Sequence, residues 1–405
     1  MSRIILFLAF LWALTGIAQA QQFNALARVE AENSRVADEA GGVRLELRLS
    51  QGVPYRLFTL EDPYRLVLDF REVDWAGLDR DAFLQSDQVK GAQFGTYVPG
   101  WSRMVLELGG PLKVDQAELQ INQATGAAFL TMLLKQTSAE QFSEYAGAPH
   151  DANWDLPEPA QIAAAPADRA DRSLRVMLDP GHGGIDPGAE AGGTDEKTLM
   201  LLFARELREL LLRSGGFEVS MTRADDHFVS LERRIAMAHR AGADVFISLH
   251  ADALSEGLAH GATVYTLDDK ASDIASSKLA ERHDRGDLIS GVDLSGADDQ
   301  VADVLLDLAR QETQPRTNAL AHALAEGMTQ QGGPMNRRAI RKASFSVLKA
   351  ADIPSVLVEL GFLSSPRDLE NLQSPEWRAA MTKGIHQGLV QWRADDLAKR
   401  SLIGQ

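Results

Sequence analysis

The pattern of apolar and polar positions divides the chain into two parts with different periodicities. In the first part, residues 43–50, 64–70, 103–108 and 128–135 alternate apolar and polar side chains, and short turn signals separate them. Alternation with period two is typical of strands that have one face in a core. We therefore expect residues 24–136 to form a small all-β sandwich.

Residues 137–173 show no sustained periodicity and are rich in Ala, Pro and Asp, as in Ala-Pro-Ala-Asp-Arg-Ala-Asp-Arg near the end of the segment. Such a composition is typical of a linker between domains.

The second part alternates apolar strands with amphipathic helices, which predicts an α/β domain over residues 174–398. Its sheet is expected to be mostly parallel, with helices on both faces. Gly215 is expected to end the first helix, and Ser230 to cap the second. A helical insertion over residues 270–330 interrupts the alternation. The expected strands are 174–179, 217–223, 244–250, 262–267 and 354–360, and the other helices are 196–215, 231–242 and 375–396.

Residues 1–20 have the pattern of a cleaved secretory signal peptide. Arg3 is their only charge, and an apolar run and Ala-Gln-Ala follow it. The run is short for a membrane span of about 20 residues, so we favour export to the periplasm over an anchor. No later stretch is apolar enough to span a membrane.

Charge and cysteine content narrow the possible functions. The formal net charge is −16, and removal of Arg3 with the signal peptide leaves 40 − 57 = −17. This balance argues against nucleic acid as a partner, although solubility alone could explain it. The chain has no cysteine, so a metal site would have to use His, Asp and Glu.

Four ionisable residues are expected at one edge of the α/β sheet. His182 follows the strand 174–179, His250 ends another strand, Glu359 lies near the end of a third, and Glu196 begins a helix. Ligands of open α/β sheets bind beyond the carboxyl ends of the strands. Two histidines and a carboxylate form a catalytic zinc set with one open position, and a further carboxylate can act as general base.

Each residue also has a simpler explanation when it is taken alone. His182 could be a turn residue, His250 a structural histidine, Glu196 a charge that complements the helix dipole, and Glu359 the partner of an arginine. The convergence of all four at one edge favours a metal site.

These residues lie in motifs that resemble the zinc-dependent N-acetylmuramoyl-L-alanine amidases. The motifs are DPGHGGIDPGA, EK, TR, LERRIAMAHRAGADVFISLHAD and IPSVLVELGFLSS, and they occur in order within residues 174–396. The resemblance implies hydrolysis of the amide bond between N-acetylmuramic acid and L-alanine in peptidoglycan. It also implies that His182, Glu196 and His250 bind one Zn²⁺ and that Glu359 is the catalytic carboxylate.

The first domain is similar to the AMIN domain of cell-division amidases, through its position, its size and segments such as YRLFTLEDPYRLVLDF (55–70). This similarity implies that it binds peptidoglycan and directs the enzyme to the septum. A plain spacer is the alternative.

The insertion resembles the regulatory segment of the division amidases. In that group a helix covers the zinc, and a LytM-type activator removes it. The family's blocking glutamate falls in this chain at His283, within ERHDRGDLI, and an imidazole can also bind zinc. We therefore expect His283 to be the autoinhibitory fourth ligand, with Glu281 as runner-up. The alternative is that His283 faces solvent.

An apolar stripe on the insertion is the candidate surface for the activator, which would dock on residues 270–312. Such a stripe is normally core, but it could instead lie in a groove of a partner. The stripe consists of Val301, Val304, Leu305 and Leu308.

Two other functions stay open at this point. A zinc carboxypeptidase could use the same ligands if Arg223, Arg338 or Arg341 held a terminal carboxylate. The second alternative is that the protein binds the cell wall without catalysis. The intact set of four ionisable residues argues against this alternative.

Overall fold

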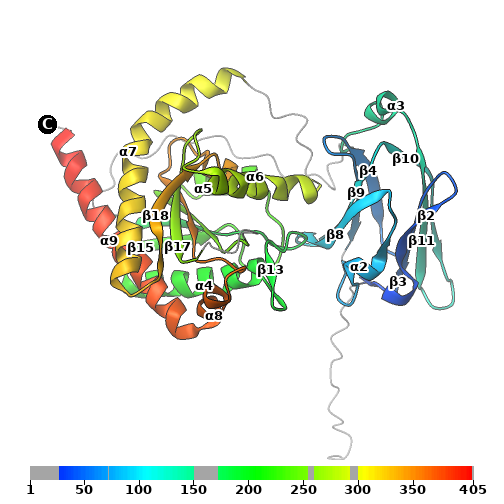
Figure 1. The fold of residues 1–405 in the computed structure, drawn as a ribbon, viewed down its shortest axis with the longest axis horizontal. Coiled ribbons are helices and arrows are strands. Elements are labelled where there is room, and N and C mark those ends of the chain that lie inside the picture. Colours follow the sequence, from blue (N-terminus) through cyan, green and yellow to red (C-terminus); the bar gives the residue numbers. More distant parts are fainter. Residues whose placement is uncertain (1–26, 72, 150–171, 254–259, 292–299, 404–405) are drawn as a thin grey trace, which may run out of the picture.

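The computed structural model describes residues 27–71, 73–149, 172–253, 260–291 and 300–403 (Figure 1). The expected signal peptide and most of the expected linker lie outside these residues. No helix among the described residues is both long and apolar enough to cross a membrane.

The N-terminal domain is a β-sandwich, as the alternating pattern predicts. One sheet has the order β10-β11-β3-β2-β7 and the other β4-β5-β9-β8. The short α3 (Ala139–Ser143) follows the last strand and places Phe142 in the core, so the packed domain extends past residue 136. The bounds are β2 (Arg35–Glu39), β3 (Gly42–Leu49), β4 (Tyr55–Leu60), β5 (Arg65–Arg71), β7 (Leu84–Gln85), β8 (Val89–Val98), β9 (Trp101–Leu108), β10 (Leu112–Ile121) and β11 (Ala128–Gln136), with β1 (Ala27–Arg28) paired to β6 (Val73–Asp74) and α2 (Arg80–Phe83) before β7.

Strand β5 is buried on both faces, which alternation alone does not predict. Leu66, Leu68 and Phe70 point into the sandwich core. Val67 and Asp69 point the other way and are also buried. The outer face of this sheet is covered by the second domain, which lies next to β8 in Figure 1.

The second domain has a six-stranded, mostly parallel sheet with the order β15-β12-β16-β19-β17-β18. Only the β17–β19 pair is antiparallel among the pairs of this sheet. The nearly continuous apolar strands suit a sheet that helices cover on both faces. The bounds are β12 (Leu174–Pro180), β15 (Phe217–Met221), β16 (Val245–His250), β17 (Ala262–Leu267), β18 (Met335–Ala343) and β19 (Ser355–Glu359).

Two helical layers enclose this sheet. Three helices pack on one face of the sheet and form a hydrophobic core with it: α4 (Glu196–Ser214), α7 (Gln300–Gln330) and α9 (Pro375–Ile403). The helices α5 (Leu231–Arg240) and α6 (Ile274–Ile289) and the turn η2 (Ser346–Leu348) pack on the other. The insertion therefore consists of α6 and α7, with α8 (Pro366–Gln373) before the last helix.

The two expected helix ends differ in outcome. Gly215 ends α4 with a φ of 76°, as expected. Ser230 stands at the N-cap position of α5, but its side chain makes no capping hydrogen bond. Asp287 of α6 caps α5 instead, accepting from Leu231 N at 2.9 and 3.1 Å. Only the tertiary fold brings this carboxylate to the helix, so local sequence could not indicate it.

Candidate metal centre

Neighbouring strands bring the four expected residues to one edge of the sheet. His182 follows β12, and His250 ends β16, which lies between β12 and β19. His250 pairs in register with Glu359, the last residue of β19. Glu196 begins α4 and is fully buried. The convergence predicted from the strand ends is therefore present.

Three of these residues form a group that could hold a metal ion. One potential ligand atom each of His182, Glu196 and His250 lies within 4.8 Å of the others. The Glu196 carboxylate lies between the rings, 3.2 Å from His182 Nε2 and 3.1 Å from His250 Nδ1. Ligands about 2.1 Å from a tetrahedral zinc lie roughly 3.4 Å apart, so the spacing fits that ion. Two imidazoles and one carboxylate also leave a coordination position for water.

The His182 loop is held in an unusual backbone conformation. His182 has a φ of 60°, in the left-handed region where residues other than glycine are strained by roughly 1–3 kcal/mol. Arg234 Nη2 donates to His182 O at 2.9 Å, and the His182 Nδ1 hydrogen bond to Asp186 Oδ2 is 2.7 Å long. This second contact leaves Nε2, which has no hydrogen-bond partner, facing the group.

Two glycines make room for the three side chains. A Cβ at Gly181 would lie 2.5 Å from His250 Nε2. Gly188 has a φ of 68°, and a Cβ there would lie 2.7 Å from Glu196 Oε2. The glycines in this loop therefore permit the rings and the carboxylate to approach each other, in addition to forming turns.

The charges of the group favour a bound cation. Burial and the neighbouring His283 lower the pKa of His250 to about 3, which keeps its imidazole neutral as a metal ligand requires. Burial opposes charge on His182 and Glu196 too. The carboxylates of Asp186 and Glu196 nevertheless raise the pKa of His182 well above its usual value. The two histidines lower the pKa of Glu196 well below its usual value.

Glu359 lies beside the group and is fully buried. Its Oε2 accepts from Asp252 N at 3.1 Å, while Oε1 has no hydrogen-bond partner. Burial, with the nearby charges of Glu196 and Asp252, raises the pKa of Glu359 to about 7. A carboxyl group of this pKa can both accept and release a proton at neutral pH.

Helix α6 places His283 over the group. The side chain is buried, with Nε2 3.5 Å from Glu359 Oε1 and 3.7 Å from Asp252 Oδ2. Its ring centroid lies 4.2 Å from that of His250. Glu281, the runner-up, is exposed and accepts a hydrogen bond from Ser277. The structure thus brings His283 to the site and not Glu281.

Four polar atoms in this region are buried without a hydrogen-bond partner: His182 Nε2, His283 Nε2, Asp252 Oδ2 and Glu359 Oε1. Buried polar groups are normally paired, so such a concentration needs an explanation. An ion or water among them would satisfy these atoms.

Two carboxylates at the site were missed by the sequence reasoning. Asp186 orients His182, and Asp252 accepts from Arg282 Nη1 of α6 at 2.9 Å. Their signal was their proximity in sequence, since Asp186 follows His182 by four residues and Asp252 follows His250 by two. Asp residues are common near turns, however, and spacing alone did not separate these from others.

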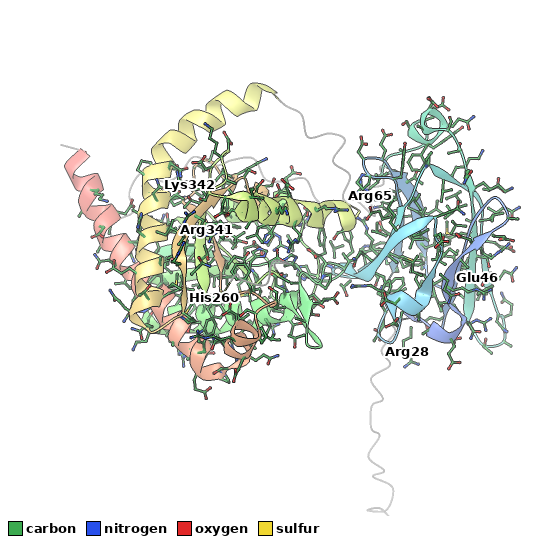
Figure 2. The ribbon with its side chains drawn as sticks, viewed as in Figure 1. Arg28, Glu46, Arg65, His260, Arg341 and Lys342 are labelled. Atoms are coloured by element: carbon green, nitrogen blue, oxygen red, sulfur yellow. The ribbon has the colours of Figure 1, made fainter. Side chains whose placement is uncertain are left out.

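The arginines considered for a carboxypeptidase are already engaged. The Arg223 guanidinium is buried and donates to Pro180 O, Gly181 O and Lys197 O. Arg341, labelled in Figure 2, pairs with Asp273 at 2.7 Å, and the exposed Arg338 lies 3.8 Å from the same carboxylate. Arg223 Nη1 also donates to Asp225 O at 3.2 Å, so the buried Arg223 cannot hold a substrate carboxylate without breaking these hydrogen bonds, four in all.

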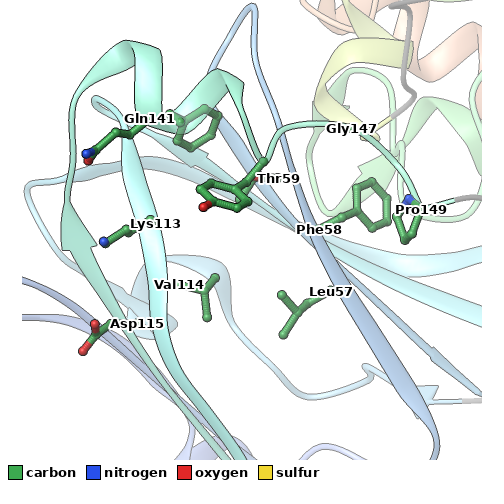
Figure 3. Close-up of a pocket in the computed structure, with 11 residues that line it drawn as sticks. Leu57, Phe58, Thr59, Lys113, Val114, Asp115, Gln141, Gly147 and Pro149 are labelled. Atoms are coloured by element: carbon green, nitrogen blue, oxygen red, sulfur yellow. The ribbon is translucent and has the colours of Figure 1, made fainter.

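The activator-docking residues lie on α7, within 300–312, where the structure describes no side chains. A cavity of about 510 Å³ lies elsewhere, in the N-terminal domain (Figure 3). Tyr145, Gln141 and Asp115 contribute to its lining. Histidine is absent from that lining, and the cavity does not include the metal group.

Comparison with known proteins agrees with both domains. Residues 176–391 match the family described as N-acetylmuramoyl-L-alanine amidase, and residues 33–129 match the AMIN domain. The chain is 32% identical to the amidase AmiC of Escherichia coli O6:H1 over 387 residues, covering 90% of each protein. It is 30% identical to AmiC of Neisseria meningitidis serogroup B over 376 residues, covering 88% of each. The solved structure of AmiC2 from Nostoc punctiforme is 27% identical, with a TM-score of 0.41, over 55% of this chain and 97% of that one.

Proposed function

The chain belongs to the N-acetylmuramoyl-L-alanine amidase family, and we propose that one Zn²⁺ held by His182, Glu196 and His250 supports its hydrolysis of peptidoglycan. The reaction class follows from the family: the enzyme cleaves the amide bond between N-acetylmuramic acid and L-alanine. The observation that carries the zinc proposal is the group of two imidazoles and a carboxylate, with the His182 Nε2 atom left unpaired.

The residues around the group have distinct tasks in this mechanism. A bound Zn²⁺ supplies a Lewis acid that lowers the pKa of water to about 7 and polarises a carbonyl. Glu359 Oε1 accepts the proton of the attacking water and then delivers it to the nitrogen of the leaving L-alanine. The Asp252 N–H holds the other carboxylate oxygen and so fixes the direction of Oε1. Asp186 fixes the tautomer and orientation of His182.

The variant Glu359→Gln tests the assignment of the general base. Measured in a His283→Ala background, where the proposed block by α6 is removed, release of stem peptides from purified sacculi should fall by about 10²–10⁴, the usual contribution of general acid–base catalysis, while the zinc content stays at one per chain. Glu281→Gln, an exposed carboxylate of α6, is the matched control and should keep its zinc. Full activity in Glu359→Gln would reject the role of Glu359.

The reaction products test the bond that is cleaved. A muramic acid with a free lactyl carboxyl group is the expected product. Loss of a terminal amino acid from the stem peptide would indicate a carboxypeptidase instead.

We also propose that α6 keeps the enzyme inactive at rest. The support is the position of His283, which is buried next to Glu359 and over the His250 ring. In that position it occupies the space that a water and a substrate amide would need. A LytM-type activator that docks on the 270–312 segment would remove the helix and open the site.

The cellular role follows from the domain organisation and is likewise a proposal. The expected signal peptide would take the enzyme to the periplasm, and the AMIN domain would bind peptidoglycan at the septum, where the amidase would separate daughter cells. The match to the AMIN domain and the similarity to two AmiC amidases support this role.

A further inference from the structure

The C-terminal end of α6 contacts the N-terminal domain through a buried arginine. Arg103 of β9 donates from Nη1 to Gly291 O at 2.7 Å and to Ser290 O at 3.2 Å, directly after the helix. Carbonyl groups at the end of a helix lack partners within it, and a cation there also complements the helix dipole. Arg103 therefore supplies both hydrogen bonds and a favourable charge.

The same guanidinium is fixed from its other side within the N-terminal domain. It makes a two-pronged ion pair with Asp69 of β5, at 2.5 and 2.9 Å. The Tyr97 ring lies 3.5 Å from its central carbon. Arg103 and Asp69 are both buried, and a planar fork held in this way is pre-organised to bind the carbonyls.

An apolar contact accompanies the arginine. Gly291 has a φ of 70° and lies so close to β5 and β9 that a Cβ would be 2.9 Å from Val67 and 3.0 Å from Val105. Both valines belong to a buried cluster that includes Ile185 and Phe228 of the catalytic domain. Ile185 follows the His182 loop residues closely, so this interface reaches from α6 to the metal group.

Backbone hydrogen bonds join the domains at the same place. Ile185 N donates to Thr96 O at 2.9 Å, and Phe228 N donates to Tyr97 O at 2.9 Å. The outer face of the β4-β5-β9-β8 sheet thus contacts both the His182 loop and the C-terminal end of α6. This explains why β5 is buried on both faces.

We propose that the N-terminal domain is a structural part of the autoinhibition: Arg103 holds the C-terminal end of α6, and with it His283, over the catalytic group. The inference rests on the proposed function of α6 as an inhibitory helix. It adds that the outer sheet face of the N-terminal domain has the catalytic domain as its partner in the resting enzyme. Release of α6 then requires the loss of the Arg103 contact.

The test compares three variants of the full chain in the absence of an activator. Arg103→Ala removes the contact, and Gly291→Ala pushes the helix end away from Val67 and Val105 while it leaves the Arg103–Asp69 pair intact. Arg71→Ala is the matched control, because Arg71 stacks on Trp101 within the same sheet. Hydrogen–deuterium exchange reports on residues 274–291, and peptide release from sacculi reports basal activity.

We expect exchange in α6 to accelerate at least about tenfold in the first two variants, since hydrogen bonds to a charged group are among the stronger ones. Basal activity should rise with it, and Arg71→Ala should behave as the wild type. Exchange in β9 and β5 shows whether the sandwich stays folded in Arg103→Ala. If the sandwich unfolds in that variant, the result for Gly291→Ala decides the test. Unchanged exchange in α6 in Gly291→Ala and in a folded Arg103→Ala would overturn the proposal. Faster exchange with unchanged activity would support the Arg103 contact and contradict the inhibitory role of α6.

Discussion

His283 Nε2 lies 3.5 Å from Oε1 of Glu359, the oxygen that we assign to proton transfer. Neither atom has a hydrogen-bond partner, and both are buried. A protonated His283 adds a positive charge next to Glu359. Burial lowers the pKa of His283, but the Glu359 carboxylate raises it, and the pKa lies above its usual value. In the proposed mechanism, an imidazole in this position would keep the Glu359 carboxylate from water and substrate.

The first prediction concerns the removal of this side chain. His283→Ala should raise basal peptide release from sacculi in the absence of an activator, because the space next to Glu359 opens. Glu281→Ala, on the same helix but exposed, should leave basal activity unchanged. Deletion of residues 273–312 should have the same direction of effect as His283→Ala. If a folded His283→Ala protein is no more active than Glu281→Ala, His283 does not block the site.

A second prediction concerns the carboxylate behind His182. Asp186→Asn keeps the shape of the side chain but removes the charge that orients and polarises the imidazole. The affinity for Zn²⁺ should fall by about 10–100-fold, as for other partners of metal-binding histidines. Competition with a coloured chelator measures the affinity. Asp225→Asn is the control, because Asp225 pairs with His227 outside the metal group. Equal zinc affinity in both variants would contradict the role of Asp186.

Strand ends explain why much of the site could be predicted from the sequence. His182, His250 and Glu359 each follow or end an apolar run, and parallel neighbouring strands place such positions at one edge. No local signal in the sequence indicates the order of the strands in the sheet. Any order in which the three strands that carry these residues are neighbours nevertheless gives the same cluster. Glu196 was found because it begins the helix after the glycine loop.

Tertiary contacts explain what the sequence could not predict. Asp287 caps α5 from a distant helix, so Ser230 was the better local candidate and the prediction was wrong. Val67 and Asp69 occupy the positions of β5 that alternation assigns to solvent, and a second domain buries them. Neither event has a signature within a short window of residues.

A third prediction concerns the cavity of the N-terminal domain. Tyr145 is 77% exposed and lines this cavity, and its lining also includes the polar side chains of Gln141 and Asp115, both labelled in Figure 3. An exposed aromatic ring beside polar groups is a common feature of binding sites. Tyr145→Ala should therefore reduce co-sedimentation of the protein with sacculi. Ile121→Ala, which truncates another exposed apolar residue of the domain, is the control. Equal binding of both variants would place wall binding elsewhere.

The last prediction follows from the burial of Asp287, which caps α5 from α6. Burial, with the charges of Asp186 and Asp284, raises the pKa of Asp287 to about 7, although Leu231 N and Arg234 oppose the shift. The unfolded value is near 3.8. The folded state therefore favours the neutral form, and the contribution of Asp287 to stability is fully present below pH 3.8 and is lost as the pH rises through 7. At one pKa unit per 1.36 kcal/mol, the loss is at most on the order of 4 kcal/mol.

Asp287→Asn tests this relation, because the amide keeps an oxygen for Leu231 N and cannot ionise. Urea unfolding should show the variant gaining stability over the wild type between pH 5 and pH 8, with the larger advantage at pH 8. The wild type should lose more stability than the variant over that interval. A difference between the two proteins that is the same at both pH values would mean that Asp287 keeps an ordinary pKa in the folded state. Since Asp287 lies on the helix that carries His283, the same ionisation should also weaken the hold of α6 on α5 above pH 7.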